Sequence, residues 1–122
     1  MKIPKFEAQT EWVKPSEFPD LRHVDEIAID LETKDPDLLK KGSGSVIKNG
    51  EVIGIAVATK HFKGYFPIAH EGGGNMDRSR VMSWLKDILE SPCTKVFHNA
   101  MYDVCWLRAM GFKINGDIAC TM

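Results

Sequence analysis

A strict alternation of apolar and polar residues predicts a β-strand at residues 26–31. Successive side chains of a strand point to opposite faces, so one face of this strand is apolar and the other ends in two acids. The apolar face consists of Ile27, Ile29 and Leu31. Asp30 and Glu32 therefore point the same way, at the end of a strand that should be burying itself.

Two more strands are predicted by the apolar runs EVIGIAVATK and GYFPIA, at residues 51–60 and 64–69. The short connection HFK between them is typical of a β-hairpin. Because the hairpin follows the first strand, we expect three neighbouring strands in an antiparallel meander. Between them, Asp35 is expected to cap a short helical turn that begins at Pro36, and residues 42–45 to form a flexible stop.

Helical spacing of apolar residues predicts an amphipathic helix at 76–90. Asp77 is a suitable N-cap, and Ser91 with Pro92 should end the helix. The apolar positions of this segment are Val81, Trp84, Leu85, Ile88 and Leu89.

The last part of the chain predicts a strand, a helix and a strand, at 94–98, 99–111 and 113–121. Asn99 can cap this helix and Gly111 can end it. The order of elements is then β-β-β-α-β-α-β. This order predicts an α/β fold of the ribonuclease H-like kind, with a mixed five-stranded sheet flanked by helices.

Composition limits the domain organisation and the partners. A chain of 122 residues with 43% hydrophobic content suits one domain, which we place at 26–122 after an irregular, proline-containing lead-in at 1–25. The net charge of −1 argues against binding nucleic acid by bulk phosphate neutralisation, so nucleic acid would be held locally or through metal ions. No apolar run approaches the length of a membrane span, so a membrane role has no support. The three cysteines form no C-x-x-C pair, which indicates reduced thiols in a cytosol-like compartment.

A third acid, Asp103, lies in FHNAMYDVCWL, near the start of the second predicted helix. Asn99 precedes it by four residues, so the two side chains share one face of that helix. If strand 94–98 lies beside the first strand, the carboxyl ends of both open into one crevice. The side chains of Asp30, Glu32 and Asp103 would then converge there.

Three like charges in a dry crevice repel each other and require protons or divalent cations. Hard oxygen ligands suit Mg²⁺ or Mn²⁺, whereas the Cys/His cluster that zinc prefers is missing. Two such ions, ~3.5–4 Å apart, activate a water and stabilise the leaving oxygen in phosphodiester hydrolysis. The alternative is that the strand simply ends at Asp30 and Glu32, with its acids solvated in a turn.

Several motifs in this order resemble the DEDD-type 3′–5′ exonucleases. IAIDLET resembles their first motif, D-x-E, and HNAMYD resembles their second, N-x-x-x-D. The segments GYFPIAHE and GDIACTM, with the amphipathic helix between them, are similar to the proofreading exonuclease domain of family A DNA polymerases. This similarity runs from about Val24 to Met122.

The resemblance implies a role for each matching residue. Asp30 and Glu32 would ligate two catalytic Mg²⁺ or Mn²⁺ ions, with Asp30 bridging both, and Asp103 would hold the second ion. Thr33 and Asn99 would contact the substrate strand. Tyr102, beside Asp103, is a candidate for stacking on a base, with a core or rim position as the alternative. The implied reaction removes nucleotides from the 3′ end of single-stranded DNA.

The third motif of that family, Y-x-x-x-D or H-x-x-x-D, has no match before Met122. The one later acid, Asp117, has no Tyr or His four residues before it and resembles a non-catalytic Asp of the family. We therefore expect a fragment of a longer polymerase chain, incomplete at its C-terminus, with weak metal binding and little or no nuclease activity. The surface left by the missing helix should favour self-association.

Two other functions compete with this one. The first is an RNA-trimming exonuclease of the same superfamily, and the second is a non-catalytic ribonuclease H-like module that binds nucleic acid or a protein. Retention of three acids speaks against the second, because unused buried carboxylates cost stability. His98 is expected to be a packed or hydrogen-bonded residue, and the loop that begins at His70 to be mobile. The expected location is the cytoplasm of a bacterium, or of the host cell if a phage encodes the chain.

Overall fold

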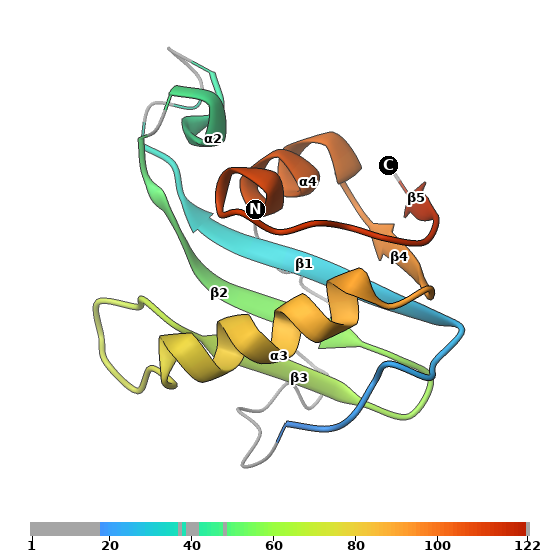
Figure 1. Ribbon diagram of the computed structural model, residues 1–122. Helices are drawn as coiled ribbons and strands as arrows, with labels where there is room; N and C mark the ends of the chain where they lie inside the picture. The colour runs from blue at the N-terminus through green and yellow to red at the C-terminus, as the bar shows by residue number, and fades with distance from the viewer. Residues whose placement is uncertain (1–17, 37, 39–41, 48, 122) are drawn as a thin grey trace.

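A computed structural model describes residues 18–36, 38, 42–47 and 49–121 of the chain. In this part of the chain the strands form one sheet of five, in the order β3-β2-β1-β4-β5 (Figure 1). The strands are β1 (Glu26–Lys34), β2 (Glu51–Ala58), β3 (Lys63–Pro67), β4 (Thr94–Phe97) and β5 (Ile118–Cys120). β1, β2 and β3 pair antiparallel, whereas β4 pairs parallel with both β1 and β5. The predicted meander and mixed sheet are confirmed.

The two long helices begin and end near the predicted residues. They are α3 (Arg78–Glu90) and α4 (Ala100–Ala109). Asp77 caps α3 by accepting hydrogen bonds from the backbone N–H groups of Ser79 and Arg80. Asn99 caps α4 by accepting one from the N–H of Tyr102. Gly111 follows α4 with a φ of +94°, a conformation that glycine adopts without strain.

The segment between β1 and β2 differs from the prediction. Residues 42–45, expected to be a flexible stop, contain the start of the short helix α2 (Gly44–Ile47). Asp35 was expected to cap a short helical turn beginning at Pro36, and this prediction falls mostly on residues outside the described part; within it, both carboxylate oxygens of Asp35 accept a hydrogen bond from the backbone N–H of Gly44. Residues 37 and 39–41 lie outside the described part of the chain. Sequence spacing missed this contact because the two partners are nine residues apart.

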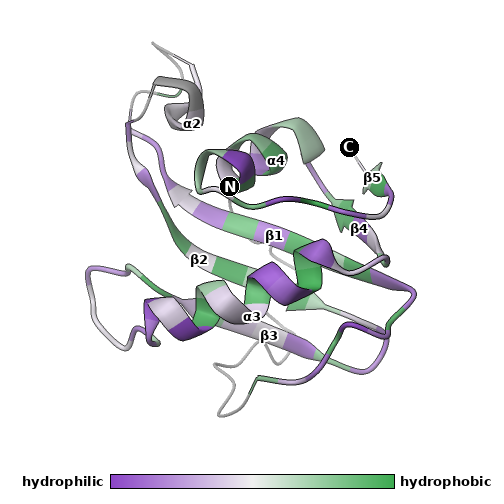
Figure 2. Ribbon diagram, viewed as in Figure 1, coloured by the Kyte–Doolittle hydropathy of each residue, from purple (hydrophilic) through white to green (hydrophobic). Residues whose placement is uncertain are grey.

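One hydrophobic core joins the sheet to its helices. The three apolar side chains of β1 are at most 2% exposed, as expected from their alternation. α3 lies across β2 and β3 (Figure 1), and its residues Val81, Leu85, Ile88 and Leu89 are buried against them. Figure 2 shows the alternation of hydrophobic and hydrophilic residues along β1 and the mixed character of α3.

Residues near the start of the described chain extend this core. Phe18 stacks on Phe66 with ring centroids 5.8 Å apart and contacts Trp84 at 5.7 Å. The indole N–H of Trp84 donates to the carbonyl of Pro19. The end of the predicted lead-in is therefore held against β3 and α3, while residues 1–17 lie outside the described part.

The described part of the chain contains free cysteines and helices that do not span a membrane. Cys93, Cys105 and Cys120 are free thiols, of which Cys93 is buried in the core. Among the described residues, no helix has the length and apolarity needed to cross a bilayer.

Candidate functional site

Asp30 and Glu32 lie on the face of β1 opposite its buried apolar side chains. Their cross-strand neighbours on β2 are small, because Asp30 pairs with Ala56 and Glu32 with Gly54. A β-bulge between Glu32 and Thr33 shifts the register directly after the second acid. Bulges bend a strand and redirect its side chains, and they are frequent beside active sites. The small side chain of Ala56 leaves room beside Asp30, whereas the space over Gly54 is occupied by the phenol of Tyr65.

Asp103 projects from the first turn of α4 and is 0% exposed. β4 pairs with β1 only as far as Ala28, so α4 rather than β4 lies beside the later part of β1 (Figure 1). Neither carboxylate oxygen of Asp103 has a hydrogen-bond partner among the described residues. A buried acid without such partners is costly in its charged form.

Burial raises the pKa of Asp103 to about 7, and the nearby charge of Asp30 adds to the rise. The backbone N–H of Leu31 lies close enough to oppose this shift without satisfying either oxygen by normal hydrogen-bond geometry. Asp30 and Asp103 thus come together as the sequence predicted. Such a pair is stabilised by a proton or by a cation.

Glu32 is bound from the side of β3. Its Oε2 accepts a hydrogen bond of 2.6 Å from the hydroxyl of Tyr65, and the Nε2 of His70 lies 3.9 Å from the same oxygen. Burial raises the pKa of the Tyr65 hydroxyl, and the hydrogen bond to Glu32 raises it further. Tyr65 therefore stays protonated and acts as a donor.

The donor chemistry of this face fits a hard divalent cation, although the ligands are not drawn into a ready-made cluster. Carboxylate oxygens are the ligands that Mg²⁺ and Mn²⁺ prefer. Among the described residues, no group of three or more His, Cys, Asp or Glu side chains is close enough to hold an ion. The buried and unbonded oxygens of Asp103 are the observation that favours a cation here.

The three residues expected to contact substrate are also near this face. The side chain of Asn99 serves as the cap of α4. The hydroxyl of Tyr102 lies 2.8 Å from the Oγ1 of Thr33 and donates to the Oδ2 of Asp35 at 2.8 Å. This network joins α4 to the end of β1 and ties up the Tyr102 hydroxyl. Contact of these residues with substrate stays a prediction.

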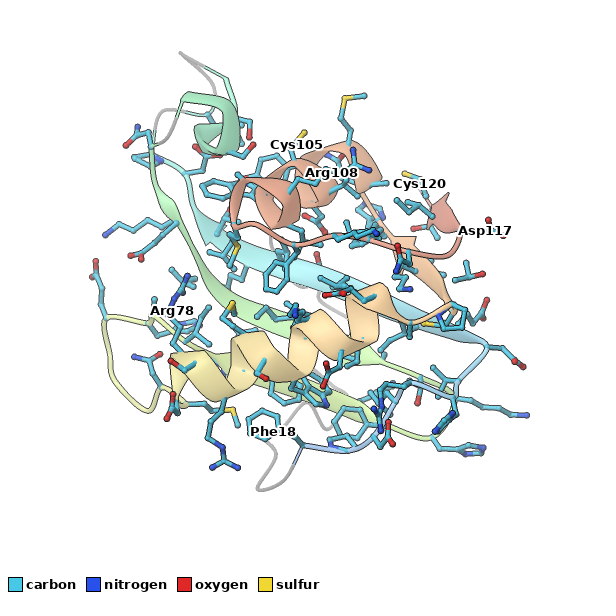
Figure 3. The ribbon with its side chains drawn as sticks, viewed as in Figure 1. Phe18, Arg78, Cys105, Arg108, Asp117 and Cys120 are labelled. Atoms are coloured by element: carbon cyan, nitrogen blue, oxygen red, sulfur yellow. The ribbon has the colours of Figure 1, made fainter. Side chains whose placement is uncertain are left out.

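Two other expectations concern residues away from the acids. His98 is exposed, and its Nδ1 makes a long contact of 3.4 Å with the Oγ1 of Thr121. Asp117 is exposed where the chain enters β5, near Cys120 and far along the sheet edge (Figure 3). That Asp117 is not catalytic stays a prediction.

Tyr65 and His70 were not predicted to be neighbours of the acids. Register contains the signal: Asp30 pairs with Ala56, and Ala56 pairs with Tyr65, so these three side chains form one row across the sheet. Counting residues through the predicted hairpin with a period of two would have placed Tyr65 on the acidic face. His70 was not considered as a neighbour of the acids because it was assigned to the start of a mobile loop.

Comparison with known sequences identifies the family. A family model described as 3′–5′ exonuclease matches residues 16–122. The chain belongs to this family of 3′–5′ exonuclease domains. It is also 41% identical over 81 residues to a DNA-directed DNA polymerase of Pseudomonas phage M6. That match covers 63% of the chain but only 12% of the polymerase.

Solved structures share the fold at low sequence identity. NrnC of Brucella melitensis with bound Mg²⁺ matches with a TM-score of 0.56 and 18% identity, over 91% of this chain and 50% of NrnC. The catalytic core of RRP6 from Trypanosoma brucei matches with a TM-score of 0.55 and 19% identity, over 91% of this chain and 29% of RRP6. These matches confirm the ribonuclease H-like fold. The chain spans about half the length of NrnC, and less of the other proteins named here.

Proposed function

We propose that this chain carries the first part of a proofreading-type 3′–5′ exonuclease site that acts on DNA, within a DNA polymerase. The observation that supports this most directly is the Asp103 carboxylate, buried without hydrogen-bond partners among the described residues and beside Asp30. A purely structural acid in such a position would only lower stability. Membership of the exonuclease family and similarity to a phage polymerase point to DNA as the substrate.

In this proposal Asp30, Glu32 and Asp103 hold two divalent cations, Mg²⁺ or Mn²⁺. When bound, such cations activate water and stabilise the leaving oxygen of a phosphodiester. The chain itself supplies the negative charge that would hold them and, in Ala56, a small neighbour beside Asp30. Asp30 lies between Glu32 on its own strand and Asp103 on α4, so it is the acid best placed to serve both ions.

The remaining roles follow from the substrate. Thr33, Asn99 and Tyr102 lie at the end of β1 and the start of α4, where a single-stranded 3′ end would approach the acids. The Tyr102 hydroxyl is hydrogen-bonded, so its ring rather than its hydroxyl is the part available for stacking on a base. A cytoplasmic location in a bacterium or a phage-infected host fits this function and stays a prediction.

The experiment measures Mn²⁺ binding to the 122-residue chain by electron paramagnetic resonance. Asp30→Asn removes one ligand charge, so its affinity for Mn²⁺ should fall by about tenfold or more. Asp87→Asn, an equal change at an exposed position of α3, is the matched control and should bind Mn²⁺ like the wild type. Equal affinity in all three proteins would argue against the proposed site.

A second measurement follows the shortening of 5′-labelled single-stranded DNA and RNA of the same sequence. We expect little or no turnover by this chain, because a third motif with its carboxylate was not found in its sequence. Any activity should depend on Asp30 and should favour DNA. Turnover near that of an intact exonuclease domain would refute the prediction of low activity, and a preference for RNA would favour the RNA-trimming alternative.

Self-association is the last part of the proposal. On the acidic face of the sheet, a depression of about 900 Å³ lies over Ala28, Ala58 and Val96. A second copy covering this surface would bury the three apolar side chains. Sedimentation velocity should then show a concentration-dependent rise in mass, whereas a constant monomer mass would exclude this contact.

A further inference from the structure

Tyr65 reaches Glu32 by crossing a strand. Tyr65 belongs to β3 and Glu32 to β1, and β2 lies between them. The phenol passes over Gly54, the residue of β2 that pairs with Glu32. A Cβ at position 54 would lie 1.8 Å from the Tyr65 hydroxyl and 2.3 Å from the adjoining ring carbon. The absence of a side chain at Gly54 is thus what lets Tyr65 touch Glu32.

A second contact fixes the direction of the hydrogen bonds. The Tyr65 hydroxyl is also 2.5 Å from the Nε2 of His70. Tyr65 donates its single hydroxyl proton to Glu32, so toward His70 the same hydroxyl can only accept, from Nε2–H. The backbone of His70 is in turn held by Asn75, which accepts from its N–H at 2.8 Å and donates to its carbonyl at 3.0 Å.

The loop that follows β3 is therefore anchored beside the site. Glu71, next to His70, forms a 2.6 Å ion pair with Lys34 at the end of β1. Gly73 and Gly74 adopt positive φ angles that close the loop back onto Asn75. Tyr65 of β3 and His70 of the loop thus both approach the same oxygen of Glu32.

We propose that Tyr65 is a positioning residue for Glu32: its hydroxyl holds Oε2 in place and leaves the other carboxylate oxygen to a divalent cation. Gly54 provides the space for this contact, and His70 holds Tyr65. The role rests on the proposed metal site. Hydrogen bonds that orient a ligating carboxylate reduce the reorganisation needed on binding, and their loss weakens metal affinity by about 10–100-fold.

Tyr65→Phe tests this role because it removes only the hydroxyl. The affinity of the chain for Mn²⁺, measured by electron paramagnetic resonance, should fall about tenfold, with an unchanged circular dichroism spectrum. Gly54→Ala should have a similar effect on affinity, because the added Cβ displaces the phenol. The matched control is Thr59→Val, which removes a hydroxyl from the turn of the same hairpin, where it accepts from the N–H groups of His61 and Phe62. It should lower the melting temperature slightly and leave the affinity unchanged.

The outcomes separate this role from the metal site itself. Unchanged or tighter Mn²⁺ binding by Tyr65→Phe, with binding still lost in Asp30→Asn, would overturn the positioning role and leave the proposed function standing. An equal loss of affinity in Thr59→Val would also overturn it, since a general loss of hairpin stability would then explain the effect. Failure of the wild type to bind Mn²⁺ would overturn both.

Discussion

Asp103→Asn should make the chain more stable than the wild type at about pH 8 in the absence of divalent cations, by roughly 2 kcal/mol. In the fold the pKa of Asp103 rises from 3.8 to about 7, so above that pH the fold must hold an unfavourable buried charge. A shift of this size corresponds to roughly 4 kcal/mol. The buried amide of Asn also lacks partners, which offsets about half of the gain.

The pH dependence of the stability difference between Asp103→Asn and the wild type identifies its cause. Between pH 3.8 and about 7 the folded wild type keeps a proton on Asp103 that the unfolded chain releases. The free energy of unfolding of the wild type should therefore fall as the pH rises through this window, whereas the amide of the variant does not titrate and contributes a constant amount. The advantage of Asp103→Asn should be largest above about pH 7 and should vanish or reverse near pH 4.

Urea denaturation in EDTA across this pH range measures the effect, with Asp87→Asn as the control for removing an exposed acid. Added Mn²⁺ should then stabilise the wild type and leave Asp103→Asn almost unchanged, because a ligand that binds only the folded state stabilises it. An Asp103→Asn chain that is less stable than the wild type at every pH would contradict the buried-charge account. Mn²⁺ that stabilises both proteins equally would place the ion elsewhere.

The sheet and the acidic pair could be predicted because they depend on short-range patterns. Alternation over residues 26–31 placed Asp30 and Glu32 on the face opposite the buried side chains, and the structure confirms this placement. Asp77 and Asn99 gave the starts of α3 and α4 because capping depends on the next three residues. Contacts between residues that are close in the sequence could thus be predicted.

The surroundings of the acids were out of reach because they depend on how distant segments meet. Tyr65 and Glu32 are 33 residues apart, and their contact requires both the register of two strand pairs and the glycine between them. Asp103 was expected in one crevice with Asp30, but the packing of α4 beside the later part of β1, which buries Asp103 completely, is not visible in a local pattern. The presence of carboxylates suited to a divalent cation could be predicted from the sequence, whereas the contacts that orient Glu32 could not.

Lys95 is the clearest example of a residue whose surroundings depend on distant segments of the chain. On β4 a lysine predicts an exposed position, yet Lys95 is 0% exposed. Its Nζ donates to the carbonyls of Ser91, at the end of α3, and of Asn115, in the segment before β5. Asn115 is bound to the same helix end, since its N–H donates to the carbonyl of Leu89. Lys95 therefore joins the two connections that flank β4.

Lys95→Ala should lower the free energy of unfolding by about 3 kcal/mol, because it empties the space of a buried side chain and leaves two carbonyls without their donor. Lys95→Met is the matched comparison: it keeps most of the aliphatic volume and removes the cost of burying an ammonium, so it should lose less than about half as much. Urea denaturation of the three proteins gives both values.

Equal losses of stability in Lys95→Ala and Lys95→Met would assign the stability to the hydrogen bonds alone. No loss in Lys95→Ala would show that the two connections hold together without Lys95. Because Lys95 lies away from the acids, Mn²⁺ affinity should not change in either variant, which separates the stability of this region from the chemistry of the site.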